Sequence, residues 1–173
     1  MLNKRLLPIT FLLILLFLLS GCGSSFDLEP RVIDPTLDDC PVCRMSIIDL
    51  RFAGQVINNL GQHENFDDIG CLILYLKRLG LEEERSLGAI YVKDFATTEW
   101  APAKEAFYVQ GRIDTPMSFG IVAFKSQEQA EEMAQKIEGK IISWEEVKLV
   151  KFDIGFGTET ETGGVQSEGE VVM

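Results

Sequence analysis

Apolar residues in the central part of the chain follow the spacing of strands in some segments and of helices in others. Short runs rich in β-branched and aromatic residues, bounded by turn-forming residues, predict strands. These runs lie at 51–58, 63–66, 88–95, around 105–110 and at 119–124. Residues 60–62, Leu-Gly-Gln, predict a tight turn between the first two strands. We interpret the mixed last segment, 141–152, as a strand after a short turn.

Two segments carry apolar residues at helical spacing. The first, 69–79, follows two N-cap candidates, Asp67 and Asp68, and ends before Gly80. Its buried face is predicted to consist of Ile69, Leu72, Ile73 and Leu76. The second follows a capping box at Ser126 and Gln129 and ends at Gly139. Its apolar stripe is predicted to consist of Ala130, Met133, Ala134 and Ile137. The charged segment between these regions, 81–86, reads as a connector.

The order of these elements predicts an α+β fold, with helices packed against antiparallel strands. Strands followed by a helix occur twice, so we expect two small β-β-α units. The folded region should span residues 38–156. It is either one compact domain or two subdomains at about 38–80 and 87–156.

The first 21 residues have the layout of a secretory signal peptide. Lys4 and Arg5 form a basic start, and an apolar run reaches Leu19. Small residues then precede Cys22, in the form of a bacterial lipobox, which predicts lipidation of the Cys22 thiol. The alternative is an uncleaved membrane anchor. Both interpretations place the remaining chain outside the cytoplasm, tethered to a bacterial membrane.

Two polar segments flank the predicted domain. Residues 22–37 contain Ser, Pro and acidic residues and suit a tether between the lipid anchor and the domain. Residues 157–173 are rich in Gly, Thr and Glu and predict a disordered, solvated tail.

The charge of the chain argues against some partners. Beyond Cys22 there are 27 acidic and 14 basic residues, a net charge of −13. So acidic a chain is a poor nucleic-acid binder, because phosphate contacts require a basic surface. An anionic lipid surface would also repel it, so membrane attachment should depend on the lipid.

Three cysteines remain for other chemistry once Cys22 is lipidated: Cys40, Cys43 and Cys71. An odd number outside the cytoplasm leaves at least one thiol outside any intramolecular pair. Cys71 falls on the first turn of the buried helix, where we expect a small core residue. A reactive role stays open, because a helix N-terminus can lower the pKa of a thiol.

The Cys40-Pro41-Val42-Cys43 segment allows several interpretations. A redox-active pair would open a helix in a thioredoxin-like unit, whereas this pair precedes a strand-like run. A structural disulfide would close a short loop and stabilise the fold only modestly. A zinc site usually requires a second pair of ligands, and only His63 and Cys71 are on offer.

Met45 favours a softer metal. Cys43 and Met45 are two residues apart, so an extended backbone would place both side chains on one face. A thiolate and a thioether suit Cu(I) better than zinc. Met117 lies in a loop-like segment before a strand, where binding groups are often placed. His63, the single imidazole, is either a further ligand or an exposed turn residue.

Five segments in order, CPVCRM, HENFDDIGCL, VKDFATTEW, TPMSFGIVAF and SQEQAEEMA, resemble the NosL family of lipid-anchored accessory proteins of nitrous oxide reductase. The resemblance covers most of 38–139, and the lipobox agrees with it. It implies a Cu(I)-binding chaperone for assembly of the copper–sulfur centre of that reductase. It also implies an α+β fold of β-β-α units similar to part of organomercurial lyase.

The resemblance also assigns residues. Cys43 and Met45 match the Cys-Gly-Met metal motif of the family, Cys40 matches its upstream cysteine, and Met117 matches its Thr-Pro-Met segment. Arg44 replaces the glycine of the motif, and it would strain the loop if that position has a positive φ.

The resulting hypothesis is an extracytoplasmic, lipid-anchored Cu(I) carrier without catalysis of its own. Cys43 and Met45 are its core ligands, completed by Cys40, Met117 or His63. Its expected partners are nitrous oxide reductase or its maturation transporter. Two chains sharing one metal through their Cys-x-Met segments would form a homodimer, which the geometry permits. The alternatives are a thiol–disulfide oxidoreductase using Cys40 and Cys43, or a lipoprotein scaffold with a structural Cys40–Cys43 disulfide.

Overall fold

The computed structural model of the chain describes residues 26–152. The signal peptide predicted at 1–21, the lipidation residue Cys22 and the tail predicted at 157–173 lie outside the described residues. Across 26–152, no helix combines the length and the apolar character that a membrane crossing requires.

Four antiparallel strands form the first sheet, in the order β2-β1-β3-β4. They are β1 (Gly54–Asn58), β2 (His63–Phe66), β3 (Leu87–Lys93) and β4 (Trp100–Pro102). The predicted turn joins β1 to β2, and the side chain of Asn58 accepts the backbone N–H groups of Leu60 and Gln62. The three-residue strand β4 was not predicted from the sequence.

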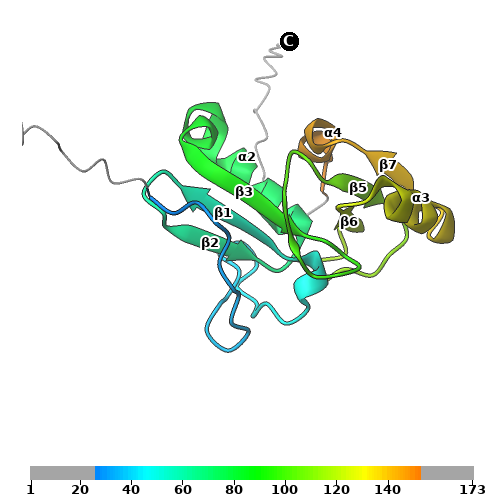
Figure 1. Cartoon of the computed structure of the whole chain (residues 1–173), viewed down its shortest axis with the longest axis horizontal. Coiled ribbons are helices and arrows are strands. Elements are labelled where there is room, and N and C mark those ends of the chain that lie inside the picture. Colours follow the sequence, from blue (N-terminus) through cyan, green and yellow to red (C-terminus); the bar gives the residue numbers. More distant parts are fainter. Residues whose placement is uncertain (1–25, 153–173) are drawn as a thin grey trace, which may run out of the picture.

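Three antiparallel strands form the second sheet, in the order β6-β5-β7. They are β5 (Phe107–Gln110), β6 (Ile121–Phe124) and β7 (Lys140–Ile142), with helices α3 (Gln127–Lys136) and α4 (Trp144–Leu149) beside them (Figure 1). The segment 141–152 is therefore only partly a strand. Its second half is helical because Ser143 and Glu146 form a capping box.

Helix α2 (Ile69–Arg85) runs further than predicted. Its expected face is confirmed, since Ile69, Leu72, Ile73 and Leu76 are all buried. Gly80 interrupts the helix with a φ of 79°, as a helix-ending glycine would. The connector predicted at 81–86 is wrong, however, because the helix resumes there as far as Arg85. This segment consists mainly of Leu, Glu and Arg, which are strong helix formers.

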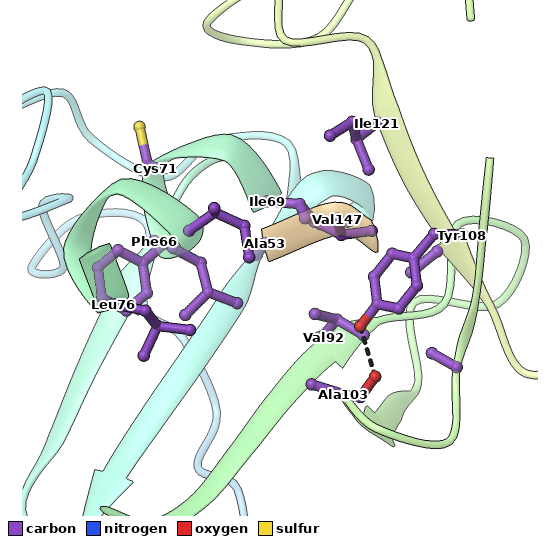
Figure 2. Packing of buried hydrophobic residues seen from close by; sticks show 14 of the residues in the cluster. Ala53, Phe66, Ile69, Cys71, Leu76, Val92, Ala103, Tyr108, Ile121 and Val147 are labelled. Carbon is purple, nitrogen blue, oxygen red and sulfur yellow. Dashed lines mark hydrogen bonds between the residues drawn. The ribbon is translucent and has the colours of Figure 1, made fainter. Parts of the chain in front are cut away.

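One apolar cluster joins the two sheets. It contains Val92 of β3 as well as Tyr108 of β5, whose buried hydroxyl donates to the carbonyl of Ala103 at 2.7 Å (Figure 2). The sheets also meet at a parallel bridge between Asp94 and Ala123. The arrangement confirms the α+β class. Because β3 and β4 pair with the first sheet, a division near 80–87 does not follow the sheets.

Part of the predicted tether lies against the domain. Ile33 is 3% exposed and belongs to the core. The backbone N–H of Arg31 donates to the side chain of Gln55 at 2.8 Å. The folded region therefore begins before residue 38, its predicted start. Apolar residues such as Ile33 lie among the polar ones in 26–37, and they allow this segment to pack on the first sheet.

Candidate metal centre

The Cys40–Met45 segment is a tight loop that reverses the chain. The backbone N–H of Cys40 donates to the carbonyl of Met45, and the N–H of Arg44 donates to the carbonyl of Cys40, both at 2.9 Å. An isolated antiparallel bridge between Asp39 and Ser46 closes the base of the loop. These bonds fix the backbone of the loop, and the thiols of Cys40 and Cys43 both lie within 4.8 Å of Cys71 on the first turn of α2.

Arg44 occupies the left-handed backbone region, with a φ of 65°. This is the conformation that favours glycine, so the strain anticipated for an arginine at this position is present. The backbone between Cys43 and Met45 is therefore a turn and not the extended segment expected from their spacing. Their side chains nevertheless line the same pocket, because the loop folds over it.

The N-terminus of α2 supplies the opposite wall. Asp68 is the N-cap residue, and its carboxylate accepts the N–H of Gly70 at 2.7 Å. Asp67, the other N-cap candidate, instead accepts a hydrogen bond from the Cys43 thiol at 3.3 Å. Cys71 follows on the first helical turn and points away from Leu76 and the labelled core side chains around it (Figure 2).

Four potential ligands converge between this loop and the helix. One ligand atom from each of Cys40, Cys43, Cys71 and Asp67 lies within 4.8 Å of the other three. Cys40 and Cys71 are fully buried and Asp67 is 2% exposed, while Cys43 is half-buried. All three cysteines are free thiols. The cluster has the residue types that bind a thiophilic metal ion.

The three thiols differ in acidity because of their mutual contacts. A hydrogen bond from Cys71 lowers the pKa of Cys40 to about 7, against the opposing effect of burial. Burial, together with the nearby Asp67 carboxylate, raises the pKa of Cys43 to about 12. The same Cys40 contact and burial raise the pKa of Cys71 well above its ordinary value. The most acidic thiol is thus the buried Cys40.

An open pocket of about 660 Å³ lies over the cluster. Its lining brings Cys43 and Cys71 together with two thioethers, those of Met45 and Met117. Met45 is 42% exposed, so it stands at the mouth of the pocket. The pocket therefore collects soft sulfur ligands where solvent and partners can reach them.

The loop that carries Met117 is fixed to α2. The backbone N–H of Met117 donates to the second carboxylate oxygen of Asp68 at 3.1 Å. Thr115 holds the rest of the loop, since its hydroxyl accepts the N–H groups of Phe119 and Gly120. Asp68 thus caps the helix and positions the second methionine beside the first.

Of the predicted ligands, Cys43, Met45 and Met117 line one pocket, and Cys40 lies beside Cys43 in the thiol cluster. His63 is placed elsewhere, half-buried at the start of β2 and paired with Ile57 of β1. Asp67 and Cys71 were not predicted as ligands. The sequence offered Cys71 as a single extra ligand for zinc, but core packing was the preferred interpretation of that residue. Asp67 was interpreted as an N-cap candidate.

Comparisons with known proteins identify a similar fold. The crystal structure of the copper chaperone NosL from Shewanella denitrificans superimposes with a TM-score of 0.61. It is 22% identical in sequence, and the match covers 69% of this chain and 96% of that one. At this identity the likeness concerns the fold. No match was found among curated proteins.

A family model also matches the sequence. The matched segment, residues 34–150, begins before the Cys-x-x-Cys loop and ends after α4, so it contains every residue of the cluster and both methionines of the pocket. The family is described as NosL. Because the match covers well over half of the sequence, the chain belongs to the NosL family.

Proposed function

We propose that this protein is an extracytoplasmic, lipid-anchored Cu(I) carrier that serves assembly of the copper–sulfur centre of nitrous oxide reductase. The observation that carries the proposal is the pocket in which the Cys43 thiol meets the thioethers of Met45 and Met117. Thiolate and thioether sulfur are the ligands that Cu(I) prefers. Family membership and the predicted lipobox support the compartment and the client.

Cys43 and Met45 are the proposed core ligands, and Met117 completes the set more readily than His63 does. Met117 lines the pocket, whereas His63 does not. Exposure of Met45 at the mouth suits transfer, because a partner's ligand can displace a thioether while Cys43 still holds the ion. The receiving partner would be nitrous oxide reductase or its maturation transporter.

The distribution of acidity disfavours a thiol–disulfide oxidoreductase. Such an enzyme needs an exposed thiol of low pKa as its nucleophile. Here the thiol with the lowered pKa, Cys40, is fully buried, and the more accessible Cys43 has its pKa raised to about 12. We therefore propose binding and transfer of copper in preference to thiol–disulfide exchange.

The proposal is tested by titration with Cu(I) under anaerobic, reducing conditions. We expect the Cys43→Ser/Met45→Leu double variant to bind Cu(I) at least tenfold more weakly than the unaltered chain, in line with the loss of two ligands. A Met133→Leu variant is the control, because Met133 lies on α3, packs against a separate apolar cluster and does not line the pocket. Equal Cu(I) affinity in the double variant and the unaltered chain would refute the assignment.

A further inference from the structure

Below the methionine-lined mouth lies a second set of ligands that the copper proposal does not use in full. Cys40, Cys71 and Asp67 are buried, and a ligand atom of each lies within 4.8 Å of the Cys43 thiol. This inner set holds three thiols and one carboxylate. Its composition differs from the thiol and two thioethers that face solvent.

An unpaired carboxylate oxygen of Asp67 indicates that the inner set of ligands can accept a cation. One carboxylate oxygen accepts the Cys43 thiol, while the other, Oδ1, is buried without any hydrogen-bond partner. Within 26–152, only this atom and the indole nitrogen of Trp144 are buried side-chain polar atoms in that state. Leaving a buried carboxylate oxygen unpaired is costly, and a bound cation would remove that cost.

The ligand number and spacing fit a tetrahedral divalent ion. Four protein ligands without an open position are typical of structural zinc sites. Zn–S bonds of about 2.3 Å in a tetrahedron place sulfur atoms roughly 3.8 Å apart. The four ligand atoms already lie within 4.8 Å of one another, so a small contraction would reach that geometry. The carboxylate suits a borderline ion such as Zn²⁺ better than Cu(I).

The surrounding structure holds these ligands in advance. The hydrogen bonds of the Cys40–Met45 loop orient both of its cysteines. The N-cap bond of Asp68 orders the turn that carries Asp67 and Cys71. The positive end of α2 also favours anionic ligands at this place.

We propose that Cys40, Cys43, Cys71 and Asp67 form a closed site for a thiophilic divalent cation of the zinc class. The argument against zinc from the sequence was the absence of a second pair of ligands, and Asp67 and Cys71 supply that pair. The inner site rests on observations that do not depend on the copper proposal, although the two sets of ligands overlap at one residue. It shares Cys43 with the outer ligands, so an ion in the inner site competes with Cu(I) for that thiolate.

Co²⁺ is the probe that tests this site, because its absorption spectrum reports coordination. The full chain in detergent should bind one equivalent of Co²⁺ with the visible bands of a tetrahedral ion and sulfur-to-cobalt charge transfer. One equivalent of Zn²⁺ should abolish both. In the Cys71→Ser variant the charge-transfer intensity should fall by about a third, and the Co²⁺ affinity should fall tenfold or more.

Two further variants keep the test decisive. Asp67→Asn preserves the shape of the side chain and should lower the Co²⁺ affinity roughly tenfold or more even if Cys71→Ser fails to fold. Met45→Leu should leave the Co²⁺ spectrum unchanged while weakening Cu(I) binding. A chain that binds no tetrahedral Co²⁺, or a spectrum that responds to Met45→Leu but not to Asp67→Asn, would overturn the inner site. Neither result would bear on Cu(I) binding by the outer ligands.

Discussion

Asp67 and Asp68 are neighbours of the same residue type, yet their carboxylates make different contacts. Asp68 accepts the N–H groups of Gly70 and Met117, so both of its oxygens stabilise backbone. Asp67 faces the thiols and keeps one oxygen unpaired. Burial raises the pKa of Asp68, which its hydrogen bonds only partly offset. The composition of the site therefore depends on which of the two carboxylates faces the cysteines, and that carboxylate belongs to Asp67.

Replacing Arg44 by glycine should stabilise the fold. An L-residue in the left-handed region costs about 1–2 kcal/mol, whereas glycine adopts it freely. The greater freedom of glycine in the unfolded chain offsets roughly 0.5–1 kcal/mol of this. We expect Arg44→Gly to raise the free energy of unfolding by up to about 1 kcal/mol, as measured by urea denaturation.

Arg44→Lys is the matched control for that measurement. It keeps the positive charge and the unfavourable φ of 65°, so its free energy of unfolding should stay near that of the unaltered chain. A glycine variant no more stable than the lysine variant would show that the loop stores no strain at this position.

At the scale of elements, the first turn of α2 organises the site. It carries Cys71 and directly follows Asp67 and the N-cap residue Asp68, and Phe119 of the Met117 loop packs on it. Gly70 permits this approach, because a Cβ there would lie 1.9 Å from Cδ2 of Phe119. The glycine thus lets the second methionine loop reach the helix.

Gly70→Ala should therefore destabilise the protein, although alanine is the better helix former. The added methyl group would displace Phe119, at a cost of about 1–3 kcal/mol typical of overpacking. Cu(I) affinity should fall as well, because the Met117 loop moves with Phe119. Thermal unfolding and Cu(I) titration measure the two effects.

A second substitution tests whether the loss of stability comes from overlap between the added methyl group and Phe119. Phe119→Leu in the Gly70→Ala background should recover part of the lost stability, because the smaller side chain leaves room for the methyl group. Additive losses from the two substitutions would contradict the proposed overlap.

Only part of these elements could be predicted from the sequence. The Cys43–Met45 pair was expected on an extended backbone, whereas the structure brings both side chains to the pocket through a turn. Most strands and the buried face of α2 were predictable, because they depend on local spacing. Asp67 and Cys71 were not, since their role depends on how the helix start is rotated against a loop about 27 residues earlier. The capping box before α4 was present at Ser143 and Glu146 and could have predicted that helix.

At the scale of the whole molecule, Asp94 joins the two sheets. It lies at the end of β3 and accepts the N–H of Lys125, just after β6, at 2.7 Å. Its other oxygen accepts N–H groups of Ala96 and Thr97. Burial raises the pKa of the Asp94 carboxyl, but these hydrogen bonds outweigh it and leave the pKa below its ordinary value.

Asp94→Asn should cost about 1.5–3 kcal/mol of unfolding free energy at neutral pH, the usual contribution of hydrogen bonds to a charged group. Because the folded state lowers the pKa of Asp94, this stabilisation is present above the pKa of the unfolded chain and is lost as the pH falls through the folded-state value. The difference between the two proteins should therefore shrink on acidification.

Urea denaturation of both proteins at pH 7 and at pH 3 measures this change. Asp114→Asn is the control, because Asp114 is exposed and its loss should alter stability by no more than about 0.5 kcal/mol at either pH. A difference between the Asp94 variant and the unaltered chain that stays constant with pH would contradict the role of the carboxylate.

The four ligand atoms beneath the pocket come from separate stretches of chain, with β1 and β2 lying between Cys43 and Cys71. An ion held by both stretches is a cross-link that closes this loop, as a disulfide would. Such closure restricts the unfolded chain more than the folded one, since the folded loop is already closed. Loss of that ion would restore conformational entropy to the unfolded state, so the protein without the ion would be the less stable form.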